Sequence, residues 1–305
     1  MSFRFVLLIA VAAYAFMSPV QAGDMTCLVS GSRPDDVKRL IGWVFDMAAS
    51  GRHPAVGDIV NKDSTLSDVP GFAGATDLGA LEGRYRVMRA AFDAGNGYFG
   101  IEVAALNAEG GVNGLLLLNR LFRLPVLFQQ PMGVITDIGT NIALLTGGRT
   151  DAVIDAEQAA ETALADAETA GVPLLMAGQS QAGGEAQLQA AYLVAKHPDR
   201  TVATGFLTLN AARVNLSVKR LGIGLDEEQG VNFVKDLDPG FGPHGLFPNE
   251  IGLQLYIHPD GSGSTVPGDQ STFSALTHPG QHLLAEFEAV SLSDALKDAC
   301  QGPQR

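Results

Sequence analysis

The sequence predicts an α/β fold with a mainly parallel sheet and helices on both faces. Residues 172–178 form a short apolar run of strand length, residues 185–198 have helical spacing, and residues 201–210 are again strand-like. A strand, a helix and a strand joined by short turns make a parallel βαβ unit. The chain has 305 residues, a length that suits one large domain of this class.

Residues 1–22 have the composition of a secretory signal peptide. They contain one basic residue, Arg4, an apolar run from Phe5 to Met17, and a small-residue end at Ala22. A membrane anchor is the weaker interpretation, because the apolar run is shorter than the ~20 residues that span a bilayer. We therefore expect cleavage after Ala22, a single mature domain over residues 23–305, and a secreted or periplasmic protein.

The two cysteines, Cys27 and Cys300, lie near the two ends of the mature chain. In an oxidising compartment this arrangement predicts one disulfide between them. Two free thiols are the alternative. Neither cysteine has a motif around it that indicates a thiol nucleophile.

The charge of the chain excludes some classes of partner. The net charge is −13, and removing residues 1–22, which carry Arg4 and no acid, gives −14. An acidic surface repels phosphate backbones, so we expect no nucleic-acid partner. No Cys/His pair has metal-ligand spacing, so no metal or cofactor is expected. The oligomeric state is not predicted by the sequence.

The N-terminal half predicts a helix and a hairpin. Apolar residues recur at helical spacing over residues 32–51, with Ser32 able to cap the start. Residues 83–93 and 97–107 are strand-like, and the Asn96-Gly97 pair between them favours a hairpin turn.

Residues 114–128 are nearly all apolar, but polar residues and a proline interrupt them. One interpretation is a buried helix. The other is an amphipathic flap that covers a site in water and opens on a lipid surface, with Arg120 and Arg123 reaching a headgroup region. Residues 151–170 predict the clearest helix of the chain, ended by Gly171.

The stretch Gly178-Gln179-Ser180-Gln181-Ala182-Gly183-Gly184 lies between the first strand and the helix of the βαβ unit. A sharp turn there strains its central residue and projects that side chain outward. The positions two before and two after must be small, as Gly178 and Ala182 are. Ser180 is therefore the candidate nucleophile, and an ordinary turn serine is the alternative.

A nucleophilic serine needs a base and an acid that orients the base. In hydrolases of this topology the chain order is Ser, acid, His. Asp238 follows a strand-like run and precedes a proline, so it is the preferred acid, with Asp236 as the rival. His278 precedes the final helical segment and is the preferred base, with His282 as the rival. The other histidines are His53, His197, His244 and His258.

Four segments resemble those of the class 3 lipases and related bacterial phospholipase-like hydrolases, which have the α/β-hydrolase fold. They are the long helix before the nucleophile strand (137–164), the nucleophile elbow (174–195), the next strand end (205–214) and the acid segment (231–239). The resemblance covers about residues 83–290. Gln179 and Gln181 depart from the usual His and Leu and are closer to cutinase-like esterases.

The resemblance implies a secreted serine carboxylic-ester hydrolase acting on a lipid or another ester. It implies one oxyanion donor at the Gln181 amide. The chain departs from the family where the family's strand ends in Arg-Gly-Thr: residues 104–111 are AALNAEGG, and Asn107 or Ala108 is the expected second donor. The alternatives are a cutinase-like esterase, a thioesterase or peptidase with the same triad, and a catalytically decayed scaffold that binds a ligand.

Overall fold

The computed structural model describes residues 33–49, 53–64, 78–89, 98–120, 147–212, 214–222, 230–235, 251–258, 260–265, 287 and 289–301. Within these residues a nine-stranded sheet has its strands in chain order. The strands are β1 (Ile59–Val60), β2 (Arg84–Arg89), β3 (Gly100–Leu106), β4 (Val112–Asn119), β5 (Leu174–Gln179), β6 (Thr204–Leu209), β7 (Gly230–Lys235), β8 (Leu253–Ile257) and β9 (Gly263–Ser264).

The sheet is parallel in its middle and antiparallel at both ends. Strands β4 to β8 run parallel to one another. The pairs β1–β2, β2–β3, β3–β4 and β8–β9 are antiparallel. The predicted hairpin of two strands is confirmed by the pairing of β2 with β3, while residues 90–97 lie outside the described part of the chain.

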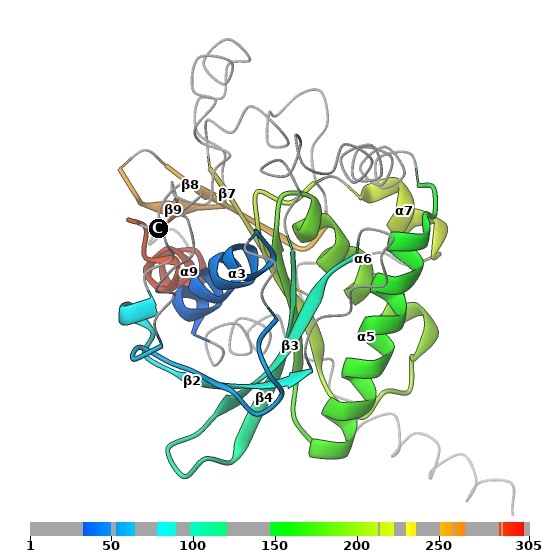
Figure 1. The fold of residues 1–305 in the computed structure, drawn as a ribbon. Helices are drawn as coiled ribbons and strands as arrows, with labels where there is room; N and C mark the ends of the chain where they lie inside the picture. Colours follow the sequence, from blue (N-terminus) through cyan, green and yellow to red (C-terminus); the bar gives the residue numbers. More distant parts are fainter. Residues whose placement is uncertain are drawn as a thin grey trace, which may run out of the picture.

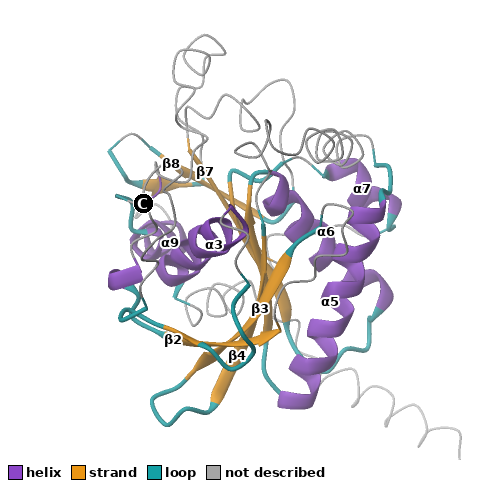
Figure 2. Cartoon of the chain, in the orientation of Figure 1, coloured by secondary structure: helices purple, strands orange, loops and turns teal. Residues whose placement is uncertain are grey.

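Helices cover both faces of the sheet, as predicted (Figures 1 and 2). Helices α3 (Pro34–Ala49) and α9 (Leu292–Gln301), with the short 3-10 turn Leu78–Ala80, lie on one face. Helices α5 (Asp151–Ala170), α6 (Gln181–Lys196) and α7 (Asn215–Arg220) lie on the other. The architecture is that of an α/β protein with a separate hydrophobic core on each face.

Strand β4 contradicts both interpretations, buried helix and flap, for residues 114–119. Residues 112–119 form a central strand whose four consecutive leucines, Leu115 to Leu118, are at most 2% exposed. Leu116 and Leu118 pack in the α3 core, whereas Leu115 and Leu117 pack in the α6 core. A central strand covered on both faces is apolar throughout. The predicted flap is therefore wrong for residues 114–119, and residues 121–128 lie outside the described residues.

The predicted βαβ unit is confirmed, with one shift of boundary. Strand β5 pairs in parallel with β6, and α6 connects them. The helix begins at Gln181, directly after Ser180, four residues earlier than the sequence pattern indicated. Helix α5 matches its predicted bounds and ends at Gly171, whose φ of 66° is left-handed.

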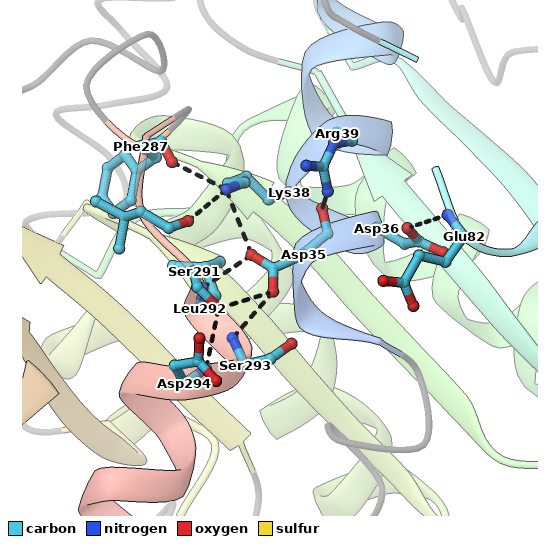
Figure 3. Close-up of polar contacts among 11 residues, drawn as sticks. Asp35, Asp36, Lys38, Arg39, Glu82, Phe287, Ser291, Leu292, Ser293 and Asp294 are labelled. Carbon is cyan, nitrogen blue, oxygen red and sulfur yellow. Dashed lines mark hydrogen bonds and ion pairs between the residues drawn. The ribbon is translucent and has the colours of Figure 1, made fainter. Parts of the chain in front are cut away.

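Side chains of α3 hold the C-terminal part of the chain (Figure 3). The Asp35 carboxylate accepts hydrogen bonds from the Leu292 and Ser293 amides at 2.8 and 3.1 Å, and so caps the start of α9. The Lys38 ammonium donates to the carbonyl oxygens of Phe287 and Val290. Helix α3 was predicted, whereas α9 was not.

Burial raises the pKa of Asp35, but hydrogen bonds from Ser293 and Leu292, with the nearby Lys38 charge, outweigh it and hold that pKa below its usual value. The carboxylate therefore stays ionised at the positive end of α9. Within the residues that the structure describes, no helix is both long and apolar enough to cross a bilayer.

Candidate active site

Ser180 occupies a strained turn between β5 and α6. Its φ of 55° and ψ of −124° are rare for a residue with a side chain. Such conformations cost about 1–3 kcal/mol and cluster at functional sites. The Ser180 amide donates to Leu209 O at 3.0 Å, and its carbonyl accepts from Ala212 N at 2.7 Å. Strand β6 therefore binds the amide of the strained residue, and a residue just after β6 binds its carbonyl.

The residues around Ser180 have no room for larger side chains. A β-carbon on Gly178 would lie 2.5 Å from the carbonyl oxygen of Ala182, and one on Gly183 would lie 2.9 Å from the β-carbon of Ala211. The expected crowding two residues before and two after the serine is therefore present. The chain has an α/β-hydrolase fold. Its strand, strained serine and following helix have the backbone geometry of a nucleophile elbow. Residues 178–184 are called the elbow below.

Gln181 is the first residue of α6, and its amide is among the donors that an α-helix cannot satisfy internally. The positive end of the helix dipole lies at the same point. The Gln181 side chain points along the helix, where its Nε2 donates to Glu185 Oε1 at 3.1 Å. This geometry places a backbone donor beside Ser180, as an oxyanion site requires.

Asn107 does not lie near Ser180. It stands in the turn between β3 and β4, where its Oδ1 accepts from the Gly111 amide at 2.7 Å. Strand β4 runs parallel to β5 with Leu118 beside Ala177. The turn precedes β4 and so lies at the amino ends of these strands, whereas Ser180 follows β5 at their carboxyl ends. Asn107 and Ala108 are therefore not retained as oxyanion donors.

The end of β4 lies beside the elbow, a position that was not predicted from the sequence. Asn119 and Arg120 follow Leu118 at the level of Gly178 and Gln179. The Arg120 guanidinium lies 5.3 Å from the centre of the Phe99 ring. The turn sequence Asn107–Gly111 followed by four leucines could have indicated this strand, because it fits a hairpin that leads into a buried strand.

Strand β7 ends at the same end of the parallel strands as β5, the strand that precedes Ser180. Strands β5, β6 and β7 are parallel neighbours, and β7 ends at Lys235. Asn210, with a φ of 44°, accepts a hydrogen bond from the Lys235 amide at 2.9 Å. Asp236 is the next residue and Asp238 the third residue after Lys235, and both lie outside the described residues.

His278 and His282 also lie outside the described residues. Phe287, five residues after His282, is described, and the Lys235 ammonium lies 5.6 Å from the centre of its ring. Two strand spacings, about 10 Å, separate β7 from β5. Five residues span up to about 17 Å and nine residues about 30 Å. The span of nine residues is long enough to bring His278 within reach of Ser180.

Comparison with solved structures finds lipases. The triacylglyceride lipase of Rhizomucor miehei aligns with 87% of this chain and 96% of its own length, at 10% identity and a TM-score of 0.44. Lipase II of Rhizopus niveus aligns with 65% of this chain and 79% of its own, at 12% identity and a TM-score of 0.37.

The extracellular lipase LipA of Serratia marcescens aligns with 63% of this chain at 12% identity and a TM-score of 0.39, and this chain spans only 33% of its length. No protein-family model and no curated protein matches the sequence.

Proposed function

We propose that the protein is an exported serine carboxylic-ester hydrolase of the class 3 lipase type, with a lipid or another carboxylic ester as its substrate. The observation that carries this proposal is the backbone of Ser180, which is strained, lies between a buried strand and a helix, and is followed by the N-terminal end of that helix. The strained conformation costs free energy, and a serine without a catalytic role would not need it.

The proposed reaction passes through an acyl-enzyme. Ser180 Oγ attacks the ester carbonyl while His278 accepts its proton, and Asp238 orients the imidazole and stabilises its charge. The Gln181 amide donates to the oxyanion of the tetrahedral intermediate. His278 then gives the proton to the leaving alcohol. In the second half of the reaction, His278 takes a proton from a water molecule as the water attacks the acyl-enzyme. The proton then passes to Ser180 Oγ as the carboxylic acid is released.

The described part of the fold supports the order of these residues. Strand β7 ends at Lys235, at the end of the parallel strands that carries Ser180, and the Phe287 ring lies 5.6 Å from the Lys235 ammonium. In an open α/β sheet, ligands bind outside the carboxyl ends of the strands. Asp236 and His282 are the alternatives for the acid and the base.

Hydrolysis of p-nitrophenyl esters with acyl chains from acetate to palmitate tests this proposal. We expect turnover by the wild-type chain, and a loss of about a million-fold, to background, in the Ser180→Ala variant. The variant should still fold, because alanine keeps the β-carbon and removes only the hydroxyl oxygen, and thermal unfolding checks this. Ser262→Ala, at an exposed serine directly before β9, is the matched control. Equal activity in the two variants would refute a role for Ser180.

The acyl-chain series also separates the alternatives. A preference for long chains supports a lipase, whereas a preference for short soluble esters supports a cutinase-like esterase. A folded wild-type chain that hydrolyses none of the esters would support the decayed scaffold.

A further inference from the structure

Helix α6 carries three buried polar side chains on one face. Gln181, Glu185 and Gln189 are 6%, 5% and 0% exposed and follow one another at four-residue spacing. Residues four apart lie above one another on a helix. The core on this face of the sheet consists of apolar side chains, most of them alanine and leucine. Burying polar groups costs free energy unless they are hydrogen-bonded, so the partners of these three side chains decide whether the stripe is stable.

Gln189 forms a closed network with two residues of the sheet. The Tyr98 hydroxyl donates to Asn119 Oδ1 at 2.7 Å, Asn119 Nδ2 donates to Gln189 Oε1 at 2.8 Å, and Gln189 Nε2 donates to the Tyr98 hydroxyl at 3.1 Å. Gln189 Nε2 also donates to Ala156 O of α5 at 2.8 Å. Tyr98 and Asn119 are each 1% exposed, so the network excludes water.

This network joins the two chain segments next to Ser180 on this side of the sheet. Asn119 is the last residue of β4, one position past the Leu118–Ala177 pair, and lies beside the strand that leads to Ser180. Gln189 lies two turns into the helix that begins directly after Ser180. The network therefore fixes α6 against the end of β4.

We propose that Tyr98 and Gln189 are positioning residues for the oxyanion site: they hold the first turn of α6, which carries the Gln181 amide, at a set separation from the end of β4. This inference rests on the proposed function. In the proposed reaction, the ester carbonyl attacked by Ser180 would lie between these two segments, and donors act on the oxyanion only at about 2.7–3.1 Å. A small shift of α6 away from β4 therefore weakens the hydrogen bonds that stabilise the transition state more than those that bind the substrate.

The chain offers a matched control for this proposal. Tyr85 is 2% exposed, and its hydroxyl donates to Asp36 Oδ2 at 2.8 Å on the α3 face of the sheet. Tyr98→Phe and Tyr85→Phe therefore each remove one buried phenol hydroxyl that donates to a buried side-chain oxygen. Only the first removal affects the contact between α6 and β4.

The test is steady-state hydrolysis of a soluble p-nitrophenyl ester by both variants at a temperature where both are folded. We expect Tyr98→Phe to lower kcat roughly tenfold with KM changed less than twofold, below the roughly 10²–10³ that removal of an oxyanion donor costs. Tyr85→Phe should lower the melting temperature by a similar amount and leave kcat within twofold of wild type.

Gln189→Met provides a second variant, and the double variant Tyr98→Phe/Gln189→Met tests whether both act through one network. We expect the double variant to lose little more of kcat than the worse single variant, because residues in one network are not additive. Equal kcat losses in Tyr98→Phe and Tyr85→Phe, or a rise in KM with unchanged kcat, overturns the proposal.

If neither Tyr98→Phe nor Gln189→Met folds while Tyr85→Phe does, the network determines folding only, and the proposal is overturned. The proposed function fails in a different way. In that case the wild-type chain itself shows no turnover, and the inference falls with it.

Discussion

A β-carbon on Gly178 would lie 2.5 Å from the carbonyl oxygen of Ala182, so the strand before Ser180 and the helix after it leave no space for a side chain. The contact is with backbone atoms, which cannot rotate away. We predict that Gly178→Ala forces the first turn of α6 outward and lowers both the melting temperature and ester hydrolysis. Overpacking of this kind costs about 1–3 kcal/mol.

Gly114→Ala in β4 is the control for this variant, because the nearest atom to its added β-carbon, Pro173 O, is 3.9 Å away. Thermal unfolding and p-nitrophenyl ester hydrolysis should show little change there. Equal tolerance of alanine at positions 178 and 114 would contradict the packing at the elbow.

The buried position of Leu117 leads to a second prediction. Its side chain is 0% exposed in the core between β4 and α6. We predict that Leu117→Ser destabilises the protein by at least the roughly 2–5 kcal/mol typical of Leu→Ala in a core. Hydrolysis of soluble and of aggregated esters should fall together, in proportion to the folded fraction.

Leu216→Ser, at a leucine that is 48% exposed on α7, should leave the melting temperature within about a degree of wild type. A loss of activity on aggregated ester alone in Leu117→Ser, with unchanged stability, would instead support the flap that the sequence suggested.

The elements that the sequence predicted correctly have a clear period or end signal. Helices α3 and α5 have apolar residues at helical spacing, and Gly171 ends α5 with a left-handed backbone. The elbow was predicted because its small residues stand at fixed distances from Ser180. Local signals of this kind are present in the sequence itself.

Strand β4 and the network behind the elbow could not be predicted in the same way. Four consecutive leucines have no period, so they fit a buried strand and a buried helix equally well. The Asn119–Gln189 hydrogen bond joins residues 70 positions apart, and no sequence pattern selects that glutamine among the four in residues 179–189. Asn107 was expected at the site because it follows β3, and the sequence suggested that this strand ends beside Ser180. The strand that ends there is the next one, β4.

A third prediction concerns pH. Glu102 of β3 is 0% exposed, and burial, with the charge of Asp166, raises its pKa from 4.5 to about 7, although Arg89 acts in the opposite direction. The folded chain therefore keeps Glu102 protonated up to about pH 7, whereas the unfolded chain ionises it near pH 4.5. The stability from this group is complete below pH 4.5 and is lost as the pH rises to about 7.

Glu102→Gln stays neutral at every pH, so its free energy of unfolding should fall less than that of wild type between about pH 5 and 8. The difference between the two proteins should change by at most about 3 kcal/mol over this range. Denaturant unfolding at several pH values measures it. Glu82→Gln, at a side chain that is 80% exposed, is the control. A wild-type to Glu102→Gln difference that does not vary with pH would contradict the raised pKa.

A fourth prediction is the disulfide between Cys27 and Cys300, which the described residues do not test. Asp35 of α3 caps α9 at Leu292, and Cys300 lies eight residues further along α9, about 12 Å. The seven residues from Cys27 to Pro34 span up to about 25 Å. The length of chain between these anchor points is therefore compatible with the bond.

Closing a loop of this length stabilises a protein by about 4–5 kcal/mol in the chain-entropy model. We expect reductant to lower the melting temperature of exported wild-type protein and to leave that of Cys27→Ser unchanged. Two free thiols, titrated in denaturant without reductant, would show that the bond is absent.

The most direct test of a nucleophilic Ser180 is the site at which a fluorophosphonate reacts. The probe bonds covalently to a serine that a neighbouring base activates, and mass spectrometry of the digested protein locates the adduct. We predict one adduct, on the peptide that contains Ser180, formed by the wild-type chain and not by Ser180→Ala. A folded wild-type chain that stays unlabelled, or that is labelled at another serine, would contradict the account.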